Sequence, residues 1–225
     1  MRRLLIFTCS FFLCWSAWPV SANNAWDGFH WARTANPFTL KVGDNLTGDW
    51  PGHLDTADDD WTASDVLDAT VVAGTITDVS SCIPPKGRVE VCNDEYGESG
   101  WLGLARIWVK KDGSGHIKKG QVLLNDTYFN TGTYDDLDAR LHVVCQEVGH
   151  TIGLDHQKGP KNKSCMNDMF GLFSADYAHP NQHDYDQLGA IYAHVDSITT
   201  VGAADSAPRV RVGAHALVVT FITWA

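Results

Sequence analysis

The stretch that decides the fold is Cys145-Gln146-Glu147-Val148-Gly149-His150-Thr151-Ile152-Gly153-Leu154-Asp155-His156. Apolar residues recur through and before it at steps of three and four, the period of an amphipathic helix: Leu141, Val144, Cys145, Val148 and Ile152. On the same helix Gln146 and His150 project from the opposite side, and Glu147 lies beside them. We therefore predict a helix that packs with one face, keeps the other for chemistry, and stops at Gly153.

The second face of this helix has the spacing of a metal site. Side chains at i and i+4, here Gln146 and His150, can reach one ion. Gly153 allows a sharp turn, so that His156 can return to the same point. Three ligands around an open fourth position is the arrangement of catalytic zinc. The spacing therefore predicts a zinc site, with Glu147 next to it.

The same segment resembles the metzincin zinc-protease motif HExxHxxGxxH. It matches that motif at Glu147, His150, Gly153 and His156, and it differs at Gln146, where the family has its first histidine. A second resemblance lies downstream, where Ser164-Cys165-Met166 is similar to the family's methionine turn. Within the clan, the layout from about residue 30 to 195 most resembles matrixin-like secreted proteins.

This resemblance implies a fold and a mechanism. The fold would be α+β, with a twisted mixed sheet, an active-site helix, a Met-turn and a C-terminal helix. Zinc would polarise the scissile carbonyl and lower the pKa of its bound water toward about 7, and Glu147 would remove the proton and return it to the leaving amine. Met166 would form the hydrophobic floor below the metal, and a disulfide between Cys145 and Cys165 would tie the helix to the turn.

The resemblance also implies where a protein or peptide substrate binds. In the family the substrate lies extended along an edge strand above the helix, where it adds to the sheet. The segment that resembles this strand runs from residue 104 to 109 and begins Leu104, Ala105, Arg106, Ile107.

The glutamine at position 146 leaves open whether the site binds zinc and catalyses hydrolysis. A glutamine carbonyl can bind zinc through oxygen, but it is neutral and a weaker donor than imidazole. The main hypothesis is a zinc metalloendopeptidase with His150, His156 and Gln146 as ligands. Its rival is a secreted peptide- or matrix-binding module that keeps the metzincin fold without catalysis. A third hypothesis is a metal-dependent hydrolase of a non-peptide amide.

The sequence divides into a leader, one domain and a tail. Residues 1–22 have a basic start, an apolar run and a small-residue cleavage pattern, which predict a secretory signal peptide cut after Ala22. We predict one protease domain over residues 23–196 and a tail of unknown role over residues 197–225. The final apolar run, 216–225, is too short for a membrane span. The domain start leaves no room for the pro-segment that blocks matrixin precursors, so we expect any restraint to come from outside the chain.

Charge and cysteines indicate an exported protein. Removing the two arginines of the signal changes the formal net charge from −10 to −12, and so acidic a chain is a poor nucleic-acid binder. Four cysteines remain, an even number for an oxidising compartment, and they allow three disulfide connectivities. We favour Cys82 with Cys92, which flank a short segment, and the resemblance implies Cys145 with Cys165.

Other elements are predicted from short patterns. Strand-like runs occupy residues 38–42, 71–76, 104–109 and 121–124, a helix is plausible near 61–67, and a C-terminal helix follows Asn181. Thr133 and Asp136 have capping-box spacing before the long helix. Three stretches carry carboxylates of the kind that hold calcium, but none has the spacing of a calcium loop, so zinc is the only metal we predict: Asp58-Asp59-Asp60, Asn93-Asp94-Glu95 and Asp112-Gly113-Ser114-Gly115.

Overall fold

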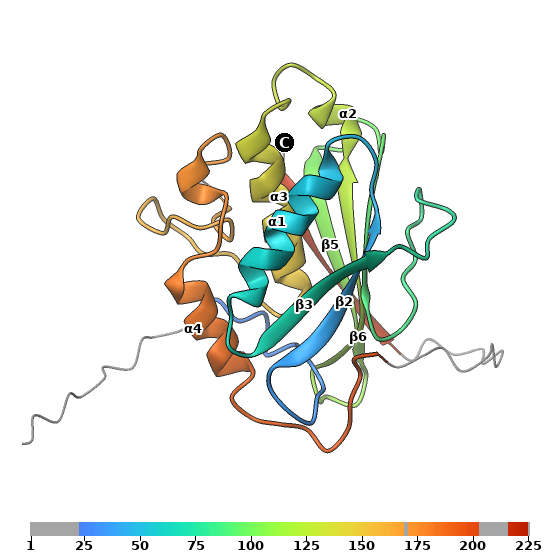
Figure 1. Cartoon of the computed structure of the whole chain (residues 1–225), viewed down its shortest axis with the longest axis vertical. Helices are drawn as coiled ribbons and strands as arrows, with labels where there is room; N and C mark the ends of the chain where they lie inside the picture. Colours follow the sequence, from blue (N-terminus) through green and yellow to red (C-terminus); the bar gives the residue numbers. More distant parts are fainter. Residues whose placement is uncertain (1–22, 169–170, 203–215, 225) are drawn as a thin grey trace, which may run out of the picture.

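One mixed sheet carries the fold in the computed structural model, which describes residues 23–168, 171–202 and 216–224. The helices α1, α3 and α4 lie on the same side of this sheet (Figure 1). The elements are β1 His30–Trp31, β2 Phe38–Asn45, α1 Trp50–Thr62, β3 Leu67–Ala73, β4 Val89–Asp94, β5 Trp101–Lys110, β6 His116–Asn125, α2 Asp126–Phe129, α3 Leu137–Thr151, the 3-10 turn Ala175–Tyr177, α4 Gln182–Ile191 and β7 Ala216–Trp224. The predicted α+β class with a mixed sheet is confirmed.

The strand order is β3-β2-β4-β6-β5-β7, with β1 beside β6. The pairs β2 with β3, β2 with β4, β4 with β6, and β1 with β6 are parallel, whereas β5 runs antiparallel to both β6 and β7. The first and the last described strands, β1 and β7, thus belong to the same sheet. The predicted signal peptide, residues 1–22, lies outside the described residues.

The helix predicted near residues 61–67 is wrong in position. Helix α1 spans Trp50–Thr62, and its buried residues recur at steps of three and four: Trp50, Leu54, Ala57 and Trp61. A proline stands in its first turn, where proline is tolerated because that position lacks an intrahelical partner. Leu67 already begins β3, whose range 67–73 also corrects the strand predicted at 71–76.

Helix α3 forms as predicted but begins four residues after Thr133. Its cap is Asp136, whose side chain accepts a hydrogen bond from the Ala139 amide at 3.0 Å. The face that carries Gln146 and His150 is buried as well as the packing face. This burial arises because α3 packs against α1 on one side and contacts β5, β6 and β7 on the other.

Helix α4 has the cap that the sequence indicated. The Asn181 side chain accepts from the His183 and Asp184 amides, and Asp184 completes a capping box. The helix begins directly after this cap and ends at Ile191. Among the described helices, none has the length and apolarity needed to cross a membrane.

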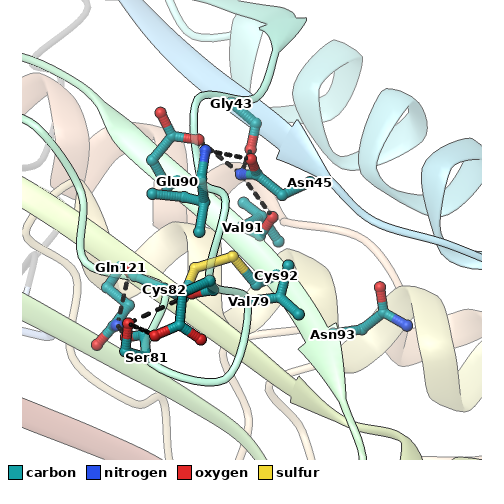
Figure 2. Close-up of a disulfide and its surroundings, with 12 residues drawn as sticks. Gly43, Asn45, Val79, Ser81, Cys82, Glu90, Val91, Cys92, Asn93 and Gln121 are labelled. Atoms are coloured by element: carbon teal, nitrogen blue, oxygen red, sulfur yellow. Dashed lines mark hydrogen bonds between the residues drawn. A yellow bond between two sulfur atoms is a disulfide. The ribbon is translucent and has the colours of Figure 1, made fainter.

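Both disulfides pair as predicted, Cys82 with Cys92 and Cys145 with Cys165. The first attaches the loop before β4 to β4 itself, and Figure 2 shows this bond with its surroundings. The Gln121 amide donates to the carbonyl oxygens of Ser81 and Cys82, at 2.7 and 2.8 Å, so the same loop is also held to β6 (Figure 2). The loop is therefore fixed on two strands.

We expect Cys82→Ser/Cys92→Ser to lower the free energy of unfolding by about 2–3 kcal/mol, because the bond closes a loop of 10 residues in the unfolded chain. Urea unfolding of the full chain measures this loss. A midpoint equal to that of the unsubstituted chain would contradict the expectation.

Candidate active site

Two histidines on either side of a tight turn converge on one point. His150 near the end of α3 and His156 in the following segment place their Nε2 atoms 3.0 Å apart. Gly153 makes the turn, with φ at +101° and no room for a side chain, because an added Cβ would lie 2.2 Å from the Phe29 carbonyl oxygen. The chain therefore returns as the sequence predicted, and glycine is required for it.

The two rings meet through their Nε2 atoms. His150 Nδ1 lies 2.8 Å from the Leu154 carbonyl oxygen, to which it donates, and His156 Nδ1 lies 3.5 Å from a carboxylate oxygen of Asp168. Burial lowers the pKa of His150 and of His156, which favours neutral rings. With its proton on Nδ1, His150 directs the lone pair of Nε2 at His156; His156 Nε2 either donates to it or, in the other tautomer, presents a second lone pair. In that second tautomer the two nitrogens can hold a metal.

Gln146 is held in one orientation. Its amide nitrogen donates to the carbonyl oxygens of Cys165 and Asn167, at 2.8 and 3.2 Å. The side-chain oxygen Oε1 is thus fixed on the other side, where it accepts a hydrogen bond from the Thr223 hydroxyl. Gln146 therefore presents its side-chain oxygen on that side. This oxygen accepts hydrogen bonds, and it is the atom of a glutamine side chain that can bind a metal.

Glu147 is fully buried beside this cluster. Burial raises its pKa to about 8, and the hydrogen bond from the Thr223 hydroxyl at 2.5 Å opposes that rise. An added Cβ at Gly103 of β5 would lie 2.7 Å from Glu147 Oε1, so the β5 backbone passes directly over the carboxylate. Burial therefore favours the protonated form of the Glu147 carboxyl.

The Met166 turn lies under the helix. Met166 is fully buried, and its sulfur occupies the space beside Gly149, where an added Cβ would lie 2.5 Å from it. The Ser164 hydroxyl accepts from the Met166 amide at 3.0 Å and donates to Asp184 of α4 at 2.5 Å. The Cys145–Cys165 disulfide joins the same turn to α3. The turn is therefore positioned by both α3 and α4.

The C-terminal strand β7 covers the cluster. The segment predicted as the substrate edge strand is not the edge of the described sheet, because β7 pairs along all of β5, with Ala105 opposite Phe221. The Phe221 ring stacks on His150, with centroids 4.1 Å apart and planes at 12°, and lies 5.1 Å from the His156 ring. Figure 1 shows β7 in dark red behind α3 and beside β5. A cavity of about 320 Å³ remains beside His156.

Sequence reasoning missed three residues of this site: Asp168, Phe221 and Thr223. Asp168 follows Met166 by two positions, and no motif marked it. Phe221 and Thr223 lie in the final apolar run, to which the sequence assigned no role. The register that places Phe221 on His150 depends on pairing with β5, which is distant in sequence.

No family model and no curated protein matches the chain. Among solved structures it is similar to high choriolytic enzyme 1, a hatching enzyme zinc-protease from Oryzias latipes, the medaka fish. The sequence identity is 10%, the TM-score is 0.43, and the match covers 81% of this chain and 98% of that one. A likeness of this size carries no argument about function, which must come from the side chains themselves.

Proposed function

We propose that the chain is a secreted zinc-dependent endopeptidase of matrixin-like, metzincin type, with its catalytic domain in residues 23–196. The observation that carries the proposal is the approach of His150 Nε2 to His156 Nε2 at 3.0 Å, beside the buried Glu147. His150, His156 and Gln146 Oε1 would hold the metal. A zinc ion there would supply a Lewis acid for the scissile carbonyl and make water more acidic.

The chain's own groups would perform the remaining steps. Glu147, ionised once the site is open to water, takes a proton from the attacking water and passes it to the leaving amine. Leu154 O and Asp168 hold the two imidazoles at Nδ1, which keeps each Nε2 directed at the centre. Met166 supports the turn of α3 that carries His150.

A peptide substrate would bind as an added strand on β5. Backbone groups of this strand already accept an extended antiparallel segment of the chain itself, which is β7. A substrate in the same position would carry its backbone directly past Glu147, because Gly103 of β5 lies over that carboxylate. This geometry supports a protein or peptide as the substrate class.

The rival function, a peptide-binding module without catalysis, is favoured by one observation. The Gln146 amide is engaged by Cys165 and Asn167, so this side chain has a structural role that needs no metal. Such a module would use β5 to bind an extended peptide and would not cleave it.

Cleavage of a denatured protein by the full chain separates the two functions. The assay compares untreated protein, protein treated with a chelator, and treated protein given zinc back. Proteolysis that stops on chelation and returns with zinc supports the endopeptidase. Peptide binding without proteolysis, at any zinc level and in a variant whose β7 is displaced, would favour the rival.

A further inference from the structure

A second group of metal-ligating side chains lies where β1, β6 and the segment after α4 meet. His30 of β1 pairs in register with His116 of β6, and His194 and Asp196 follow α4. One ligand atom from each of His30, His194 and Asp196 lies within 4.8 Å of the others. These residues come from opposite ends of the described domain and share no motif.

The His30 and His194 rings meet through their Nε2 atoms, which are 3.2 Å apart. His30 Nδ1 lies 2.8 Å from the Gly28 carbonyl oxygen, to which it donates, so its Nε2 carries the lone pair. This is the arrangement already described for His150 and His156. Two nitrogen ligands of a tetrahedral ion at about 2.0–2.1 Å stand about 3.3 Å apart, close to the observed spacing.

The Asp196 carboxylate faces the same point and is held from outside. One oxygen lies 3.9 Å from His194 Nε2 and accepts from His116 Nε2 at 3.0 Å. The other lies 3.8 Å from His30 Nε2 and accepts from the Arg33 guanidinium at 3.0 Å. Arg33 and His116 therefore orient the carboxylate, as hydrogen-bonding neighbours of metal ligands do.

We propose that His30, His194 and Asp196 bind a divalent transition metal, with zinc the best fit to two imidazoles and a carboxylate. His194 has a half-exposed side chain, so the site opens to water and leaves room for a solvent ligand. The ion would join β1 to the segment after α4 and would be separate from the His150–His156 centre. Its role is structural.

Zinc content of the full-length chain tests this site. We expect about two zinc ions per chain, about one in His194→Ala and about one in His150→Ala, because each site loses a first ligand. His179→Ala is the matched control, since His179 is also half-exposed and paired with a carboxylate, that of Asp60. It should keep the full content.

The result that overturns the second site is His194→Ala with the zinc content of the unsubstituted chain. Loss of zinc in His194→Ala with none lost in His150→Ala would support the second site and count against the proposed catalytic centre. Thermal unfolding gives a second readout, because zinc should raise the Tm of the unsubstituted chain more than that of His194→Ala.

A different observation carries a second proposal, which rests on the proposed function. Strand β7 occupies the whole length of β5, the strand on which a substrate would lie. Phe221 covers both histidine rings, and the Thr223 hydroxyl lies within hydrogen-bond distance of Gln146 Oε1 and of Glu147 Oε1. On this face of β7, Phe221 and Thr223 reach the catalytic groups.

We infer that β7 is an internal competitor for the substrate cleft, held in place of a substrate and not cut. The Phe221 ring and the Thr223 hydroxyl occupy the centre where the scissile bond of a substrate would lie. The proposed restraint therefore lies within the chain, as an alternative to a restraint from outside it. A substrate must displace β7. Its apparent affinity is therefore the intrinsic affinity multiplied by the fraction of chains in which β7 has left β5.

Two full-length variants test this competition in opposite directions. In Val219→Pro/Phe221→Pro, prolines interrupt the strand and remove the ring on His150, so β7 should leave. In Arg106→Cys/Thr220→Cys, two directly opposed residues whose side chains already touch at 3.3 Å would be joined by a disulfide. Leu217→Ala is the matched control, because Leu217 is an exposed residue of the same strand.

The readout is binding of a fluorescent peptide with the sequence of residues 216–225, measured beside cleavage of denatured protein. The proline variant should bind the peptide at least about tenfold more tightly than the unsubstituted chain, and the oxidised cysteine variant should not bind it. Equal peptide binding by the unsubstituted chain, the proline variant and the oxidised cysteine variant would overturn the proposal that β7 competes with substrate. Binding that follows this order without any cleavage would support the competition and contradict the endopeptidase.

Discussion

Glu147→Gln is expected to reduce the rate of protein cleavage by about 10²–10⁴-fold, the usual contribution of a general acid–base group. Glutamine has the same shape and still accepts the Thr223 hydroxyl through its oxygen, so the fold and the metal should be retained. What is lost is the group that takes the proton from water.

The rate is measured with β7 displaced, so that occlusion does not hide the effect, and zinc content is measured in the same samples. Glu98→Gln, an exposed glutamate in the loop before β5, is the matched control and should cleave at the unsubstituted rate. If Glu147→Gln keeps more than about a tenth of the rate, Glu147 is not the base.

Gln146→His is expected to raise the affinity for zinc by about a hundredfold or more, because imidazole is a better donor to zinc than a neutral amide oxygen. The same change removes the two hydrogen bonds to Cys165 O and Asn167 O, which lie in the interior. An unsatisfied buried carbonyl costs about 1–3 kcal/mol. The metal-free variant should therefore unfold at a lower temperature and recover when zinc is added.

Competition with a zinc-binding dye gives the affinity, and thermal unfolding with and without zinc gives the stability. His142→Gln provides a comparison on the same helix, since His142 is also buried one turn earlier and is no part of the proposed centre. A variant that binds zinc no more tightly than the unsubstituted chain would show that position 146 does not face the metal.

Local sequence patterns predicted the elements whose geometry is local. Helix α3, the glycine turn and the return of His156 depend on residues within one short segment, and all of them form. Asn181 could be predicted as the N-cap of α4 for the same reason. Helix α1 lies before the predicted range because its buried positions begin at Trp50 and end at Trp61, and Leu67 already belongs to β3.

Features that depend on pairing between distant segments could not be predicted from the sequence. Phe221 meets His150 only because β7 pairs with β5 in one register, and a shift of one residue would turn the ring to the other face. His30 and His194 meet across 164 residues. Asp168 approaches His156 only through the path of the loop after the Met-turn. Nothing in the local pattern marks such contacts.

Gln146 shows how a departure from a motif can be read in two ways until its neighbours are known. From sequence it was a weak ligand or a lost one. In the structure its nitrogen donates to Cys165 and Asn167 in the turn around Met166, and its oxygen accepts a hydrogen bond from Thr223 of β7. The side chain therefore stabilises the turn, and its oxygen is the atom that it could offer to a metal once β7 is displaced.

The proposed function requires that His150 and His156 hold one zinc ion. Anomalous diffraction at the zinc edge, from crystals of the full chain grown with zinc, locates such an ion. We expect a peak about 2.0–2.1 Å from both Nε2 atoms. An empty position between the two rings, with zinc present in the crystal, would contradict it.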